Sequence, residues 1–131
     1  MAVYTIPVAP TAKGRPRVVR AKNGHSMTYT PDKTVDAEER IRWHLRQANA
    51  TQHPKGVALV LTIQFVVARP KSKPKSAYPT TRPDLDQYLK LFLDAGNGIL
   101  WEDDSQVVSI YAGKQYGDCA GIVARVEVME E

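Results

Sequence analysis

Five carboxylates flank one short, mostly apolar segment of this chain. Asp84 and Asp86 precede the segment, and Glu102, Asp103 and Asp104 follow it. In an extended backbone the side chains of residues i and i+2 point the same way, so the first two carboxylates converge. Converging negative charges need a cation between them, and Mg²⁺ or Mn²⁺ is the hard ion that carboxylate oxygens suit. A helix and a glycine turn between the two groups would bring a third carboxylate to the same place.

Basic residues gather in two stretches that contain no acid, and these stretches hold ten of the 18 lysines and arginines. The members are Lys13, Arg15, Arg17, Arg20 and Lys22 in the first stretch and Arg69, Lys71, Lys73, Lys75 and Arg82 in the second. Such clusters suit a phosphate backbone, because binding releases its counterions, although two solvated loops would show the same charges. Together with the carboxylates they predict metal-assisted phosphodiester hydrolysis, in which the metal activates water and the cations hold phosphates.

Each of these features also has a plainer interpretation. Asp84 and Asp86 can cap a helix and favour its dipole, WEDD can be an acidic turn, and Lys90 can pair with Asp86 one turn earlier. A calcium loop is disfavoured, because no third ligand follows at the required spacing. Ser105 has no evident histidine partner for a nucleophilic triad. The histidines are scattered and predict no zinc site: they are His25, His44 and His53.

Hydrophobic periodicity predicts the strands that must position these residues. Residues 57–67 are apolar at every second position, and their other face is partly apolar too, which is typical of a central, buried strand. An Asn-Gly pair between two short strand-like segments predicts a hairpin. The remaining predicted strands are residues 3–8, the hairpin segments 17–21 and 26–30, and the closing strands 107–111 and 122–129, which we expect to be antiparallel across the GKQYGDCAG connection.

Two segments have helical spacing. The first begins with Thr30 as cap and Pro31 at the first position, or later with Thr34 as cap, and ends before Pro54. Its predicted apolar stripe is Val35, Ala37, Ile41, Leu45 and Ala48. The second runs from about 85 to 95 and ends at Gly96 and Gly98. Its predicted core face is Leu85, Leu89, Phe92 and Leu93.

The predicted fold class is α+β, with a single mixed or antiparallel sheet covered by two main helices. The 131 residues fit one domain, 1–131, with a modest core. Residues 69–83 contain several prolines and alternating lysines, which predicts a mobile loop.

The composition excludes several classes of protein. With 43% hydrophobic and 24% charged residues, the chain has the composition of a soluble globular protein. Its longest apolar run, 57–68, is too short for a membrane helix, and the first ten residues lack the features of a signal peptide. Cys119 is the single cysteine, so no intrachain disulfide is possible. A reducing cytoplasm is the simplest interpretation, and no membrane partner or small-molecule cofactor is expected.

The segment RPDLDQYLKLFLDAGNGILWEDDSQV, residues 82–107, resembles the signature of the RusA family of Holliday junction resolvases. KGRPR at 13–17 and YTP at 29–31 are similar to the N-terminal signature of phage and prophage members of that family. The resemblance therefore covers most of the chain. It implies a RusA-like fold and a homodimeric, magnesium-dependent endonuclease that cuts four-way DNA junctions by paired, symmetric nicks.

The resemblance also implies roles for individual residues. It places the three essential aspartates, catalytic and metal-binding, on Asp84, Asp86 and Asp104, and the important lysine on Lys90. Asp94 and Asp103 match further acidic positions with secondary roles. The residues expected to bind DNA are Lys13, Arg15, Arg17, Lys71, Lys73, Lys75 and Arg82.

Two departures from the family pattern leave every carboxylate in place. Gln87 stands where asparagine is usual, and Gly96 replaces a leucine, which should loosen the end of the helix. Two alternative functions stay open at this point. One is a DNA-binding accessory module with a silent acidic cluster, and the other is a nuclease that acts on flaps or replication forks.

Overall fold

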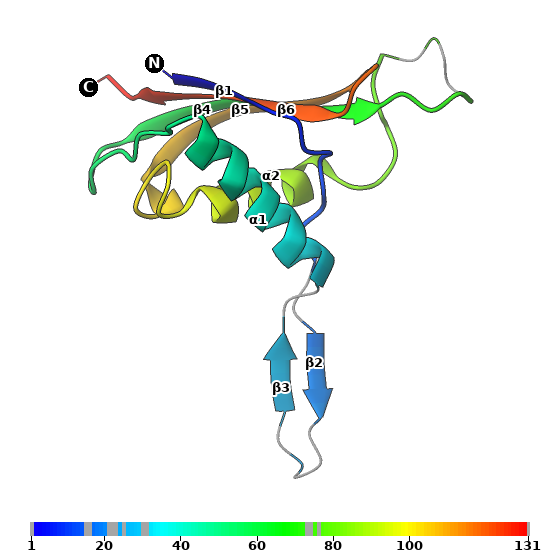
Figure 1. The fold of residues 1–131 in the computed structure, drawn as a ribbon, viewed down its shortest axis with the longest axis horizontal. Coiled ribbons are helices and arrows are strands. Elements are labelled where there is room, and N and C mark those ends of the chain that lie inside the picture. Colours follow the sequence, from blue (N-terminus) through cyan, green and yellow to red (C-terminus); the bar gives the residue numbers. More distant parts are fainter. Residues whose placement is uncertain are drawn as a thin grey trace.

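A four-stranded mixed sheet forms the framework of the protein (Figure 1). The computed structural model describes residues 2–14, 17–20, 24, 26–29, 32–72, 75 and 77–130, and for residues 17–20 and 26–29 it describes the backbone. The sheet has the order β1-β6-β4-β5, in which β4 is parallel to β5 and antiparallel to β6, and β6 is antiparallel to β1. The strands are β1 (Ala2–Ile6), β4 (Leu59–Ala68), β5 (Val107–Gly117) and β6 (Gly121–Val128).

Strand β4 is the central strand that its alternating sequence predicted. The side chains of Leu59, Leu61, Ile63 and Phe65 are at most 1% exposed and belong to the hydrophobic core. Burying each of them stabilises the fold by about 1.5–3 kcal/mol relative to exposure. Hydrogen-bonded neighbours on both sides satisfy the backbone of this strand, which is what a largely buried strand requires.

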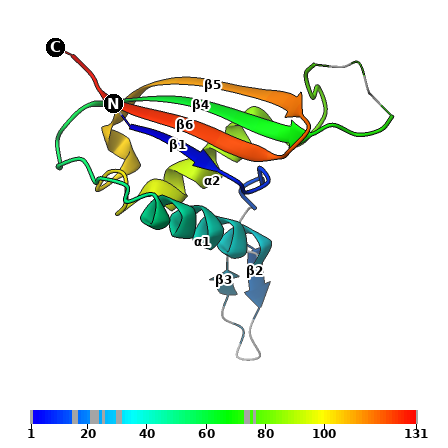
Figure 2. The ribbon, with the colours of Figure 1, turned by 45° about the horizontal axis from the view of Figure 1, so that its top comes forward.

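The predicted antiparallel orientation of the last two strands is confirmed, but β5 and β6 do not pair with each other. Strand β4 lies between them, as Figure 2 shows. The short connection therefore crosses the end of β4 and is not the turn of a hairpin. The physical reason is that β4, apolar on both faces, is best placed with a neighbour at each edge.

Two helices cover one face of the sheet (Figures 1 and 2), so the predicted α+β class is confirmed. Helix α1 (Asp32–Gln47) buries Ala37, Ile41 and Leu45 as predicted, but Val35 is 45% exposed and Ala48 is exposed. Their places in the core are taken by Thr34 and Glu38. Thr34 is therefore inside the helix and does not cap it, while the other proposed cap, at residues 30 and 31, lies outside the described residues.

Helix α2 (Leu85–Gly96) spans the predicted segment with one more residue, but its core face is rotated. Leu85, Leu89 and Leu93 are half-buried at the margin of the core. The buried face consists of Tyr88, Leu91, Phe92, Ala95 and Gly96. The prediction followed the leucines and overlooked Tyr88, whose ring packs against that of Phe65 with 5.5 Å between centroids.

The predicted N-terminal hairpin is present. Strands β2 (Arg17–Arg20) and β3 (Ser26–Tyr29) pair antiparallel in a separate two-stranded sheet. In Figure 1 this ribbon projects from the body near the start of α1. Residues 21–23 and 25, in the predicted Asn-Gly turn, lie outside the described part of the chain.

Gly96 ends α2 at a point where a side chain does not fit. A Cβ at Gly96 would lie 2.7 Å from Cζ2 of Trp101 and 3.3 Å from Cδ1 of Leu100. Both neighbouring side chains are fully buried, so neither has free space to move into. The expected loosening of the helix end stays a prediction, but packing against Trp101 supplies a separate reason for glycine here.

We therefore expect Gly96→Ala to destabilise the protein by about 1–3 kcal/mol, the usual cost of overpacking a core, although alanine is the better helix former. The free energy of unfolding in urea measures this change. In a Trp101→Phe background the smaller ring leaves more room, so the same substitution should cost less. Equal costs in the two backgrounds would show that contact with the indole ring is not the cause.

Candidate active site

The first pair of carboxylates stands at the start of α2. Asp84 is the N-cap residue of this helix, Asp86 lies in its first turn, and both are exposed. The side chain of Gln87 accepts a hydrogen bond from the Asp84 N–H at 3.2 Å. Gln87 therefore serves the helix start, where its extra methylene relative to asparagine extends its reach. The helix dipole favours acids at these positions, so the plainer interpretation accounts for their location without excluding a role in metal binding.

Lys114 fixes the loop that leads into this helix. From β5 its ammonium donates to the carbonyl oxygens of Thr81 at 2.9 Å and Pro83 at 3.0 Å. The Arg82–Pro83 peptide bond between these carbonyls is cis. Lys114 thus holds the entry to Asp84 against the sheet. Sequence analysis missed it, because a lone lysine within a strand gives no signal of a contact with a distant loop.

The second group of carboxylates forms a tight turn before β5. Glu102 and Asp103 are exposed, Asp104 is half-buried, and Asp104 opens the short 3₁₀ helix η1 (Asp104–Gln106). A carboxylate oxygen of Asp103 accepts the Ser105 N–H at 3.2 Å. Hydrogen bonds from the hydroxyl and N–H of Ser105 lower the pKa of Asp103, and the charge of Lys90 adds to this effect. We call residues Glu102–Gln106 the acidic turn.

Gln106 links the acidic turn to the segment at residues 54–57 by side-chain hydrogen bonds. Its amide oxygen accepts the N–H groups of Glu102 and Asp103 at 3.0 and 3.3 Å. Its amide nitrogen donates to the carbonyls of Pro54 and Val57 at 2.8 and 3.1 Å. Gln106 is buried, so these four bonds satisfy both the oxygen and the nitrogen of its amide. Gln106 had no predicted role. The signal in the sequence that could have indicated one is a single amide side chain between a run of acids and a strand.

A groove of about 520 Å³ adjoins the acidic turn. Its wall includes Lys55 and Val57 from the segment that Gln106 holds, Asp103 and Ser105 from the turn, and Val108 at the start of β5.

Helix α2 and the acidic turn are neighbours, but the predicted carboxylate ligands are not arranged around one metal position. Helix α2 and η1 are in contact, and Lys90 is near enough for its charge to act on Asp103. Within the described part of the chain, no three histidine, cysteine or acidic side chains are placed to hold a metal ion. The oxygen donors suit Mg²⁺ or Mn²⁺. An ion at Asp84, Asp86 and Asp104 would therefore have to draw these carboxylates closer.

Lys90 forms an ion pair with Asp94, one turn later in the helix, and not with Asp86, one turn earlier. Its ammonium lies 3.4 Å from Oδ1 of Asp94, one turn later, and its side chain is 59% exposed. Asp94 is 23% exposed and also contacts Lys13, with 3.1 Å between Oδ2 and Nζ. Asp94 thus links the exposed Lys90 to the interior.

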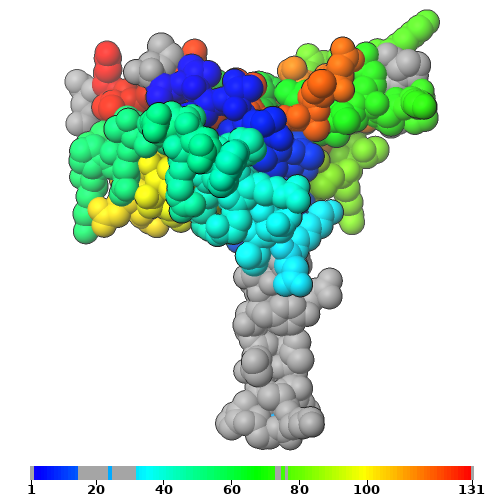
Figure 3. Space-filling view, in the orientation of Figure 1, coloured from blue at the N-terminus to red at the C-terminus, as the bar shows by residue number. Residues whose placement is uncertain are grey.

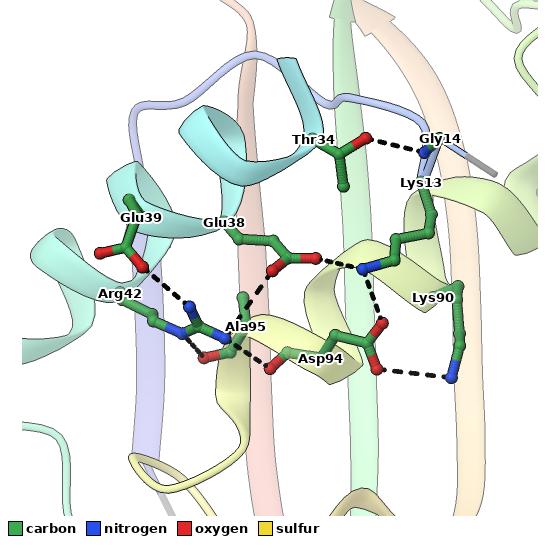
Figure 4. A network of polar contacts seen from close by, with 9 residues as sticks. All are labelled: Lys13, Gly14, Thr34, Glu38, Glu39, Arg42, Lys90, Asp94 and Ala95. Carbon is green, nitrogen blue, oxygen red and sulfur yellow. Dashed lines mark hydrogen bonds and ion pairs between the residues drawn. The ribbon is translucent and has the colours of Figure 1, made fainter. Parts of the chain in front are cut away.

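Lys13 binds two acids and both helices, as Figure 4 shows. Its ammonium lies 2.5 Å from Oε1 of Glu38, and its backbone N–H donates to the carbonyl of Gln87 at 3.0 Å. Burial alone would lower the pKa of Lys13, but hydrogen bonds and charges from Glu38 and Asp94 outweigh it and the pKa is raised. A contact with DNA stays a prediction for Lys13, and any such contact would compete with these two carboxylates.

The other predicted DNA-binding residues come from two stretches of the sequence, before residue 18 and after β4. Lys71, Lys75 and Arg82 are exposed on the loop after β4, whose green atoms extend from one end of the body in Figure 3. Lys73 and Arg15 lie outside the described residues, and Arg17 is described by its backbone alone.

The histidines that the structure describes take other contacts. The ring of His44 packs edge-to-face on Trp43 with 4.8 Å between centroids, and the backbone N–H of His53 donates to the carbonyl oxygen of Leu100. Across the described ranges, no helix is long and apolar enough to cross a membrane.

Comparison with known proteins identifies the class to which this fold and these carboxylates belong. The family model for endodeoxyribonuclease RusA matches residues 7–128, which include both acidic groups, both helices and the whole of β4 and β5. The chain belongs to the RusA family of endodeoxyribonucleases, which act on branched DNA. It is also similar to the uncharacterized protein YqaN of Bacillus subtilis (strain 168), with 30% identity over 96% of this chain and 92% of the relative.

Gln106→Ala should destabilise the protein by about 2 kcal/mol or more, because buried N–H and carbonyl groups lose their partners. The urea midpoint of unfolding measures this loss. Gln115→Ala, at an exposed position of β5, is the matched control and should change the midpoint little. A similar shift in both variants would show that the four bonds of Gln106 do not hold the acidic turn.

Proposed function

We propose that this protein is a magnesium-dependent endonuclease that resolves four-way DNA junctions. The observation that supports this most is the RusA family match across residues 7–128. The contact between α2 and η1 supports it further, because each acidic group lies on or beside one of these two elements. Asp84, Asp86 and Asp104 would hold Mg²⁺, or Mn²⁺ in its place, through carboxylate oxygens. Such an ion activates water and offsets negative charge on the phosphate that is attacked.

The chain's own residues would bind and orient the DNA. Lys90 is an exposed cation whose charge acts on Asp103 of the acidic turn, and we assign it the stabilisation of extra negative charge in the transition state. Lys71, Lys75 and Arg82 lie on the loop that leads directly to Asp84, so phosphates held there would flank the scissile phosphate. Lys73, from the same basic stretch of the sequence, would add to this contact, and Arg15 and Arg17 would contact a second arm of the junction.

Symmetric cleavage of a four-way junction requires two active sites. We therefore propose a homodimer, in which a two-fold axis relates the acidic groups of the two subunits. Paired nicks that leave 5′-phosphates could be resealed by a ligase. The process served would be DNA recombination and repair, or the removal of branches from phage DNA, in the cytoplasm.

We expect Asp104→Asn and Asp84→Asn each to reduce cleavage of a synthetic four-way junction by at least 100-fold while junction binding stays intact or tightens, since removing an acid lowers repulsion with phosphate. Cleavage in Mg²⁺ and gel-shift affinity measure the two effects. Asp118→Asn, at an exposed site between β5 and β6, is the matched control and should cleave normally. Parallel loss of binding and secondary structure in the two variants would indicate a folding role instead.

One observation favours a second candidate: the described carboxylates do not form a ready-made group of three metal ligands. The alternative is a DNA-binding module whose acidic cluster is silent. Junction binding without nicks in Mg²⁺ or Mn²⁺ at any enzyme concentration would support it. Flap and fork substrates in the same assay test the remaining alternative, a nuclease for other branched DNA.

A further inference from the structure

An alternating series of charges crosses from α1 to α2 beneath the sheet. In order, its members are Arg42, Glu38, Lys13, Asp94 and Lys90, and each neighbouring pair is an ion pair in Figure 4. Lys90, at one end, is 59% exposed, whereas the side chains of the other four are between 11% and 24% exposed. The series thus has one solvent-facing end, Lys90, whose charge acts on Asp103 of the acidic turn. We call these five residues the charge series.

Asp94 is held at both its main chain and its side chain. Arg42 donates to the carbonyl oxygens of Asp94 and Ala95, each at 3.1 Å, which satisfies acceptors at the end of α2. Lys13 takes Oδ2 of the carboxylate and leaves Oδ1 to Lys90. An isolated exposed pair between Lys90 and Asp94 would restrain Lys90 weakly. A carboxylate already fixed by partly buried partners restrains it better.

Lys13 is in turn fixed by contacts that do not involve Asp94. Glu38 binds its ammonium, its backbone N–H donates to Gln87, and the next N–H, of Gly14, donates to Oγ1 of Thr34 at 2.8 Å. Partly buried charges are costly unless they are paired, so Lys13, Glu38 and Asp94 depend on one another. The segment that carries Lys13 leads directly into β2, which begins at Arg17.

We propose that Asp94 and Lys13 are positioning residues, which hold the ammonium of Lys90 beside the acidic turn and make its position depend on docking of the segment before the β2–β3 hairpin. This inference rests on the proposed nuclease function for its effect on cleavage. The positioning itself is a property of the folded chain. Lys13 thereby acts through Asp94 and is not a phosphate contact.

The first test uses NMR and needs no activity. The Cε–Hε signal of Lys90, assigned with Lys90→Arg, should shift in Asp94→Asn, because Asp94 contacts Lys90. It should also shift in Lys13→Met, because Lys13 acts on Lys90 through Asp94. Lys13→Arg keeps the charge and should leave the signal near its original position. Lys33→Met, at an exposed site of α1, is the matched control and should leave it unchanged. An unshifted Lys90 signal in folded Lys13→Met would overturn the proposal, whether or not the protein is a nuclease.

The second test separates positioning from DNA contact. Lys13→Met and Asp94→Asn should each lower the cleavage rate at saturating junction about tenfold or more, and neither should lower it further in a Lys90→Met background. The dependence of junction affinity on salt should keep its slope in Lys13→Met, whereas Lys71→Met should reduce the slope by about one. Additive losses of rate, or a reduced salt slope in Lys13→Met, would contradict the proposal. If the wild-type protein never cleaves DNA, the proposed nuclease function is contradicted. The NMR test then decides whether Lys13 and Asp94 position Lys90.

Discussion

Trp101 fills the space that Gly96 leaves open, and this contact fixes where the chain turns after α2. Its indole N–H donates to Oδ1 of Asn97 at 2.9 Å, which ties the ring to the end of the helix. Because the ring is fully buried, the three acidic residues that follow must emerge beside α2. An apolar contact thus sets the position of the acidic turn. The carboxylates themselves would oppose being gathered, since like charges repel in the absence of a cation.

Helix α2 is fixed by cations that reach it from three different parts of the chain. Lys114 from β5 holds the loop at its start, while Lys13 binds the carboxylate of Asp94 and Arg42 from α1 binds carbonyls at its end. Each cation meets carbonyl or carboxylate oxygens, so each attachment also places positive charge near a helix rich in acids. The helix that carries Asp84 and Asp86 is therefore attached at both ends, and preorganisation of this kind is what a site with several ligands needs.

The sequence predicted the elements better than the contacts between them. Periodicity located both helices, the hairpin and β4, because burial on one face of an element leaves a regular pattern. It did not place β4 between β5 and β6, since no local pattern records which strands become neighbours. It also failed on the faces of α2, where Tyr88 competes with three leucines for the core. Both acidic groups were found from their residue types, whereas the roles of Gln106, Lys114 and Glu38 depend on partners at least 20 residues away or on backbone groups of distant loops.

Strands β4 and β5 are parallel, so everything between them is one crossover connection: a long loop, α2 and the acidic turn. The register of the two strands is set by their own hydrogen bonds and by the packing of α2, and not by the length of the loop at 69–83. Loop closure costs little more when a loop grows by a few residues. The length or charge of this loop can therefore change while the carboxylates stay where the crossover places them. Under the proposed function, such a change would alter how the loop contacts DNA.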